Sequence, residues 1–143
     1  MNGLRTTLTV LALTLLIAGC STGPADIHYG SDECAHCRMM IADPAFASQM
    51  VTVTGKAVKF DAIECMGSYR SENPAEAEGA SFWVSDFNEP GTWLGLEDAV
   101  LIQSENIRSP MGAGLLAVES QQAAERHMAE YPGQRTSWER IAR

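Results

Sequence analysis

The stretch Ala47–Ser71, ASQMVTVTGKAVKFDAIECMGSYRS, contains the succession of elements that decides the fold. Apolar and polar residues largely alternate from Ala47 to Val53, which is typical of a strand with one face on a core. A turn signal follows at Thr54 and Gly55, and Ala57–Phe60 has the composition of a partner strand. This part of the chain therefore predicts a β-hairpin.

The second part of the same stretch predicts a helix. Asp61 and Glu64 have the spacing of a capping box, so we expect a helix to begin there and to run to about Ser71. The acidic, Ala-rich segment 73–79 indicates a loop, and residues 81–87, SFWVSDF, indicate a third strand. The predicted order is β-β-α-β.

The same order of elements recurs in the rest of the chain. Ala99–Ser104 and Leu115–Val118 are predicted strands joined by a Gly-rich turn. Ser120 can cap a helix that ends near Tyr131, and Gln134–Trp138 indicates a last short strand. We therefore expect an α+β fold in which two similar ββαβ units pack together, with an internal duplication indicated by element order alone.

The length of the chain limits the number of domains, and its charge limits the classes of partner that it can bind. The chain has 143 residues, of which 45% are apolar and 20% charged, and its formal net charge is −8. That length suits one ordinary domain or two very small ones. We expect a folded domain at residues 32–143, with halves at 32–90 and 91–143. Nucleic acid is not an expected partner, because binding it depends on Lys and Arg neutralising phosphates.

The start of the chain has the features of an export signal. An apolar run that ends at Ala18 is short for a membrane span and is followed by Gly and Cys. This resembles a bacterial lipobox and predicts a signal peptide over residues 1–19 and lipidation of Cys20. Ser21, where Asp would retain the protein in the inner membrane, favours the outer membrane. Residues 20–31 would then form the lipidated Cys and a flexible leash. An ordinary signal peptide with a coincidental Cys is the alternative.

Sulfur-containing side chains gather in two motifs. They are Cys37-Arg38-Met39-Met40 and Cys65-Met66. Thiolate and thioether together form the ligand set that selects Cu(I), whereas zinc sites rarely use Met and hard cations prefer oxygen. These motifs predict a Cu(I) site. His36, between Cys34 and Cys37, is a candidate nitrogen ligand.

Other interpretations of the cysteines stay open. Cys34 and Cys37 form a Cys-x-x-Cys pair, which can be a structural disulfide in an oxidising compartment. The three cysteines beyond Cys20 are an odd number, so at least one of them has no partner in the chain. A thioredoxin-like redox motif is disfavoured, because a short apolar segment and a turn follow the second Cys where that motif opens a helix. Met66 can be a core residue as easily as a ligand.

Five segments occur in the order found in a known family. They are Glu33–Ile41 (ECAHCRMMI), Asp43–Gln49 (DPAFASQ), Lys59–Met66 (KFDAIECM), Trp83–Phe87 (WVSDF) and Arg108–Gly114 (RSPMGAG). Together they resemble the signature of the nitrous oxide reductase accessory lipoproteins, the NosL family, from about Asp32 to Trp138. The family's fold is similar to the predicted pair of ββαβ units.

The resemblance also implies metal ligands. Cys37 and Met39 match the Cys and Met of the family's Cys-Gly-Met motif, in which Arg38 here replaces Gly. Met111, in Ser-Pro-Met-Gly, matches a Met that the family places near the site from the other half of the chain. Further candidates are Cys34, His36, Cys65 and Met66, of which the two cysteines occur in only some branches of the family.

The resemblance implies that the protein is a metal carrier rather than an enzyme. Such a protein binds one Cu(I) per chain and delivers it, through an envelope membrane complex, for assembly of the copper–sulfide centre of nitrous oxide reductase. We expect it to be lipid-anchored in the envelope of a denitrifying bacterium, facing the periplasm. A thiol–disulfide reductase that maintains a copper site, and a structural lipoprotein with one disulfide, are the alternatives.

Overall fold

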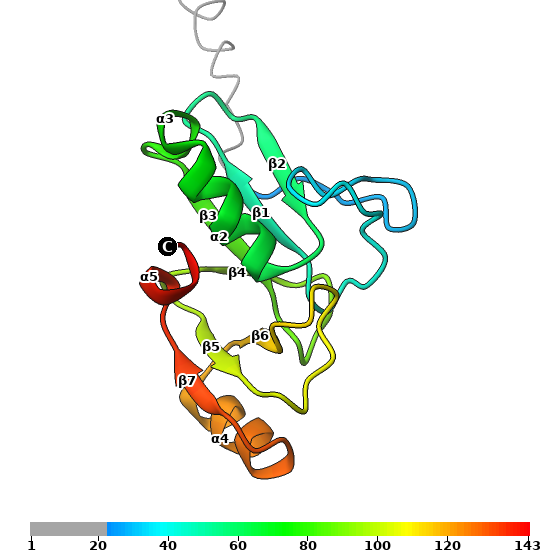
Figure 1. Cartoon of the computed structure of the whole chain (residues 1–143), viewed down its shortest axis with the longest axis vertical. Helices are drawn as coiled ribbons and strands as arrows, with labels where there is room; N and C mark the ends of the chain where they lie inside the picture. The colour runs from blue at the N-terminus through cyan, green and yellow to red at the C-terminus, as the bar shows by residue number, and fades with distance from the viewer. Residues whose placement is uncertain (1–22) are drawn as a thin grey trace, which may run out of the picture.

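The predicted hairpin forms one side of the first sheet in the computed structural model, which describes residues 23–143 (Figure 1). The first unit contains β1 (Ser48–Val51), β2 (Ala57–Phe60), α2 (Ile63–Glu72), α3 (Pro74–Ala77), β3 (Ser81–Ser85) and β4 (Trp93–Gly95). β1 pairs antiparallel with β2, and Met50 lies opposite Val58. β3 pairs with the other side of β1, which gives the strand order β2-β1-β3-β4. β2 is therefore an edge strand.

The second unit repeats the arrangement of the first. It contains β5 (Val100–Gln103), β6 (Leu115–Val118), α4 (Gln121–Glu130), β7 (Gln134–Thr136) and α5 (Trp138–Ile141). Its strand order is β6-β5-β7, so each unit places its first strand between its second and third. All of these pairs are antiparallel. The prediction of an α+β fold built from two ββαβ units is confirmed.

Strands β5 and β6 are buried on both faces of their sheet. Leu101 and Leu115 belong to the core of the first unit, together with Met66 of α2. Ile102 and Leu116 belong to a second core, which the helix α4 covers. A sheet buried on both faces needs continuous apolar strands, which explains the unbroken sequence Leu-Leu-Ala-Val of β6. This shared burial fixes the second unit against the first.

The capping box predicted at Asp61 and Glu64 is wrong. The residue before α2 is Ala62, in extended backbone, and no side chain caps the helix there. Asp61 instead lies beside Cys37, and Glu64 accepts hydrogen bonds from the loop at residues 109–114. The two carboxylates make tertiary contacts that the spacing did not reveal. At α4 the predicted cap is confirmed, because the Ser120 hydroxyl accepts a hydrogen bond from the Ala123 amide.

Three short elements differ from the sequence prediction. The predicted loop at 73–79 contains α3, which has Pro at its first turn. The strand β4 pairs with β3, so the first unit continues beyond residue 90, where we had placed the boundary between the halves. The helix α5 packs on α2 so closely that a Cβ on Gly67 would lie 2.9 Å from the carbonyl oxygen of Ile141. Elements this short depend on tertiary contacts, which local patterns do not encode.

The fold holds the chain from Ala25 onward. Gln49 of β1 is fully buried, and its amide accepts a hydrogen bond from the Ala25 N–H (3.0 Å) and donates one to the Ala25 carbonyl (2.7 Å). Ile27 packs against the first core. A buried amide needs hydrogen-bond partners, and Gln49 finds them in the backbone of Ala25. The flexible leash predicted for residues 20–31 therefore ends before residue 31.

The predicted signal peptide at residues 1–19 and the lipidation site Cys20 lie outside the described residues. From residue 23 to residue 143, no helix has the length and apolar character that crossing a bilayer requires.

Two glycines in the 109–114 loop give a matched test of this packing. Both Gly112 (φ 79°) and Gly114 (φ 66°) have left-handed backbone. A Cβ on Gly112 would meet open space, whereas one on Gly114 would lie 2.0 Å from the carbonyl oxygen of Ser104. We expect Gly112→Ala to lower the free energy of unfolding by about 1 kcal/mol and Gly114→Ala by about 3 kcal/mol. Urea unfolding followed by circular dichroism measures both, and equal losses would contradict the packing described.

Candidate metal centre

Cys34 and Cys37 lie on a tight hairpin that precedes the first sheet. The Cys34 N–H donates to the carbonyl of Met39 (2.8 Å), and the Arg38 N–H donates to the carbonyl of Cys34 (3.0 Å). The chain therefore reverses direction within residues 34–39. Cys34 lies at the start of this turn, and Cys37 lies within it.

Contacts with the edge strand β2 hold the hairpin in place. The Ala35 N–H donates to the carbonyl of Lys59 (2.9 Å). The Lys59 ammonium forms an ion pair with Asp32 (2.7 Å), and both side chains are largely buried. Because Lys59 lies two residues before Asp61, the hairpin is fixed directly beside the junction of β2 and α2.

Arg38, which replaces the Gly of the family motif, has the left-handed backbone conformation that favours Gly. Its φ is 66°, and it is the one residue other than Gly with positive φ among residues 23–143. A side chain in this region costs about 1–2 kcal/mol relative to Gly. The Arg38 guanidinium forms an exposed ion pair with Glu33 (3.0 Å), which adds little stability. The substitution therefore keeps the turn of the motif and adds a positive charge next to Cys37 and Met39.

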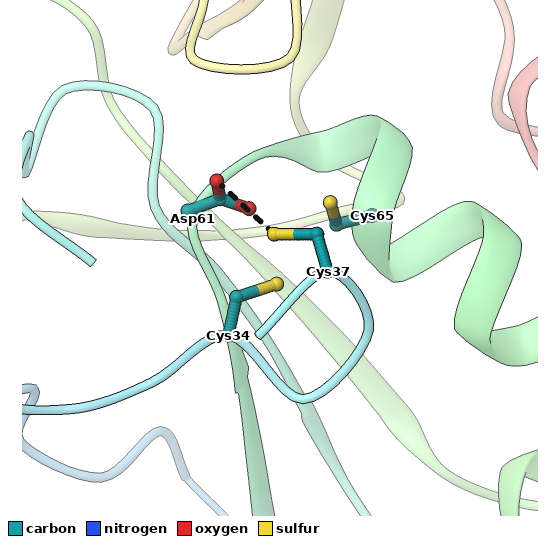
Figure 2. Close-up of side chains that lie close together, drawn as sticks. All are labelled: Cys34, Cys37, Asp61 and Cys65. Atoms are coloured by element: carbon teal, nitrogen blue, oxygen red, sulfur yellow. Dashed lines mark hydrogen bonds between the residues drawn. The ribbon is translucent and has the colours of Figure 1, made fainter. Parts of the chain in front are cut away.

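Four side chains converge where the hairpin meets the start of α2 (Figure 2). Asp61 follows directly after β2, and Cys65 lies in the first turn of α2. Ligand atoms of Cys34, Cys37, Asp61 and Cys65 all lie within 4.8 Å of one another. We call this group the thiol cluster. Three sulfur atoms and one carboxylate oxygen are thus close enough to bind a single ion.

Burial and hydrogen bonding differ among the four members of the thiol cluster. Cys34, Asp61 and Cys65 are buried, whereas Cys37 is partly exposed. The Cys37 thiol donates to Asp61 Oδ2 (3.6 Å), and Asp61 Oδ1 is buried without a hydrogen-bond partner among residues 23–143. All three cysteines are free thiols, so the disulfide considered for Cys34 and Cys37 is not formed. The cluster therefore offers thiol sulfur atoms and an unpartnered carboxylate oxygen, with access from solvent at Cys37.

The thiols do not ionise alike. A hydrogen bond from the Cys65 thiol, aided by the N–H groups of Asp61, Cys37 and His36, lowers the pKa of Cys34 to about 6 against the opposing effect of burial. The same hydrogen bond to Cys34, together with burial and the Asp61 carboxylate, strongly raises the pKa of Cys65. Burial raises the pKa of Cys37, and the neighbouring charges of Cys34 and Asp61 add to the effect. Cys34 is therefore the thiol of the cluster that loses its proton most readily.

Sulfur ligands of this kind bind soft and borderline ions. Thiolates favour Cu(I) and Zn(II), and a carboxylate oxygen is a harder donor than Cu(I) requires. A cation in the cluster would replace the thiol protons and neutralise charge that is otherwise buried. The arrangement can therefore bind a soft cation.

The other predicted ligands lie on the surface, partly buried, or in the core. Met39, on the hairpin, is 46% exposed, and Met111, on the 109–114 loop, is 43% exposed. His36 Nδ1 lies 3.3 Å from a carboxylate oxygen of Glu72. Met66 is fully buried and packs in the first core. The structure thus joins Cys37 to Cys34 and Cys65 and leaves the two methionines on the surface.

Asp61 is a member of the thiol cluster that the sequence analysis missed. It was interpreted as a helix cap because Glu64 follows at capping-box spacing. The sequence did contain a feature that indicates Asp61 as a cluster residue. Asp61 directly follows a strand and precedes Cys65 by four residues, and this spacing places the two residues near each other at the start of a helix.

The effect of Asp61 on the thiols can be tested directly. Asp61→Asn removes a negative charge that raises the pKa of Cys37 and of Cys65. We therefore expect thiolate absorbance near 240 nm to develop at lower pH in this variant. Glu72→Gln, which removes an exposed carboxylate outside the cluster, serves as the control and should leave the titration unchanged. A titration that is the same in Asp61→Asn and in the unsubstituted protein would contradict the proposed electrostatics.

Comparisons with known proteins agree with the geometry. The crystal structure of the copper chaperone NosL from Shewanella denitrificans matches with a TM-score of 0.69 and 18% sequence identity, over 80% of this chain and 92% of that one. At this identity the match shows a shared fold. No curated protein matches the chain. The NosL family model matches residues 24–143, which include every element of both units. The chain therefore belongs to the NosL family.

Proposed function

We propose that this protein is a non-enzymatic carrier that binds one Cu(I) at the thiol cluster. The observation that carries the proposal is the convergence of three free thiols and one carboxylate within 4.8 Å in a member of the NosL family. A solved structure with the same fold is that of a copper chaperone. Thiolate sulfur is the donor that selects Cu(I) most strongly, and copper is here the cargo.

Ligand exchange accounts for both loading and release. Cu(I) enters at Cys37, the most accessible thiol of the cluster, and displaces its proton to solvent. Met39 lies two residues away on the same hairpin, and its exposed thioether is a neutral ligand that needs no deprotonation. Met111 approaches from the second unit. In release, a soft ligand of the acceptor enters before these ligands leave, which a low coordination number permits.

The acceptor that we propose is the assembly system for the copper–sulfide centre of nitrous oxide reductase. Support for this comes from family membership, together with the lipobox-like sequence that ends at Cys20. In this proposal the protein is lipid-anchored in the cell envelope, at the outer membrane, and faces the periplasm. A docking site on a membrane complex would receive the metal there.

Anaerobic Cu(I) competition against a chromophoric chelator tests the site. We expect one Cu(I) per chain and weaker retention of Zn(II). Cys37→Ala should reduce the affinity most, by about a hundredfold, because a thiolate supplies charge to the cation; Met39→Leu and Met111→Leu should each cost about tenfold. Cys65→Ala tests whether a buried thiol of the cluster also binds the metal. Met→Leu roughly preserves volume, so unchanged urea unfolding would attribute the loss to ligation.

Two results would contradict the carrier proposal. The first is Cu(I) binding by Cys37→Ala that equals that of the unsubstituted protein. The second is turnover of a disulfide substrate, which the alternative function, a thiol–disulfide reductase, requires. A pKa of about 6 at Cys34 suits disulfide exchange, but this side chain is 0% exposed, so a protein disulfide cannot reach its sulfur. The exposed Cys37 has the raised pKa and is the weaker nucleophile at neutral pH.

The anchor is tested separately from the metal. If Cys20 is lipidated, Cys20→Ser should move the protein from the membrane fraction to the soluble periplasmic fraction, or leave an uncleaved precursor. Fractionation and blotting measure this, with Cys37→Ser as a control that leaves the lipobox intact. A membrane pool that does not change in Cys20→Ser would reject the lipid anchor.

A further inference from the structure

We propose that Glu64 is a positioning residue that holds the loop carrying Met111 against the start of α2, in the segment that supplies Asp61 and Cys65 to the thiol cluster. Through this contact it determines how much Met111 contributes to Cu(I) binding. The inference rests on the proposed function and adds to it a residue with no direct part in coordination.

The 109–114 loop is a tight turn that Ser109 organises from within. The Gly112 N–H donates to the Ser109 carbonyl (3.0 Å), and the Gly114 N–H donates to the Ser109 hydroxyl oxygen (2.9 Å). The Ser104 N–H donates to the Gly114 carbonyl (3.0 Å), which fastens the end of the loop to the second sheet. The turn leaves Met111 at its outer end.

Glu64 binds this loop from the opposite unit. Its Oε1 accepts hydrogen bonds from the Ser109 hydroxyl (3.1 Å) and from the Ala113 N–H (3.4 Å), on either side of Met111. Its Oε2 is buried and has no partner in the described part of the chain. A half-buried carboxylate is costly to place in a helix that could carry a neutral residue there. The two hydrogen bonds to the 109–114 loop offset part of the cost of burying the Glu64 carboxylate, and they indicate that Glu64 holds this loop.

Glu64 is also the residue next to the thiol cluster. It immediately precedes Cys65 and follows Asp61 by three residues, so the loop is attached to the segment that supplies two of the four ligand atoms. Figure 2 shows this loop, in yellow, passing beside the start of α2. The Met111 side chain is 43% exposed and belongs to neither core, so it does not fill a gap in the packing between the units. A flexible, apolar side chain held exposed at this position is suited to ligation.

A double-mutant cycle with Met111 separates positioning from general stability. The variants are Glu64→Leu, Glu64→Gln, Met111→Leu and the double variant Glu64→Leu/Met111→Leu. We expect Glu64→Leu and Met111→Leu each to weaken Cu(I) binding about tenfold, and the double variant to be no weaker than either alone. Glu64→Gln keeps an acceptor oxygen at the same position and should stay within about threefold of the unsubstituted protein.

A spectroscopic measurement reports on Met111 itself. In protein labelled with ¹³C at the methionine methyl groups, Cu(I) loading should shift the Met111 methyl signal in the unsubstituted protein and in Glu64→Gln. The shift should be absent or much smaller in Glu64→Leu. If Glu64→Leu does not fold, Ser109→Ala, which removes one donor to the carboxylate, takes its place with the same expected direction.

The outcomes distinguish this inference from the proposed function. Additive losses in the double variant, or a full Met111 methyl shift in a folded Glu64→Leu, would show that Glu64 only stabilises the fold and would overturn the inference. If Cys37→Ala loses Cu(I) binding in the same experiments, the proposed carrier function would still be supported. Failure of the unsubstituted protein to bind Cu(I) would overturn the carrier, and the positioning role with it.

Discussion

The burial of one carboxylate among three thiols is the constraint on which the site depends. Asp61 is 2% exposed, and one of its oxygens has no hydrogen-bond donor. A buried carboxylate without cationic or donor partners is unfavourable, so the protons held on Cys37 and Cys65 offset part of its charge. A cation in the same place would compensate it more fully.

That constraint holds only because the strand-to-helix junction is fixed from several sides. The hairpin with Cys34 and Cys37 is attached to the edge strand β2, α5 packs against α2 at Gly67, and the second unit contacts α2 through Glu64. Ser48 of β1 donates to the carbonyl of Ala62, just before α2 begins. Ligand positions supported by rigid elements hold a site more accurately than loops alone. Both units thus help to fix the helix that carries Cys65.

The sequence predicted the parts of the fold that local patterns encode. The hairpin of β1 and β2, the unbroken apolar strand β6 and the Ser120 cap of α4 follow from periodicity and capping, which act over a few residues. The elements α3, β4 and α5 are too short for such signals. Cys37 was predicted as a ligand from its motif, whereas Asp61 was misassigned because a capping box and a tertiary contact use the same residue type. Only the packing of the Cys34–Cys37 hairpin on β2 shows that Asp61 makes the tertiary contact and not the helix cap.

The uneven exposure of the sulfur atoms bears on how a carrier can be both selective and able to release its metal. Cys34 and Cys65 are buried, Cys37 is partly exposed, and Met39 and Met111 are 46% and 43% exposed. Buried thiols are kept from solvent oxidants and hold the ion in a site where water competes poorly. Exposed thioethers bind without charge and are the ligands that an incoming soft donor can displace first. In the carrier that we propose, release would begin at the surface while the buried thiols still held the ion, so that copper would not pass through solution between the protein and its acceptor.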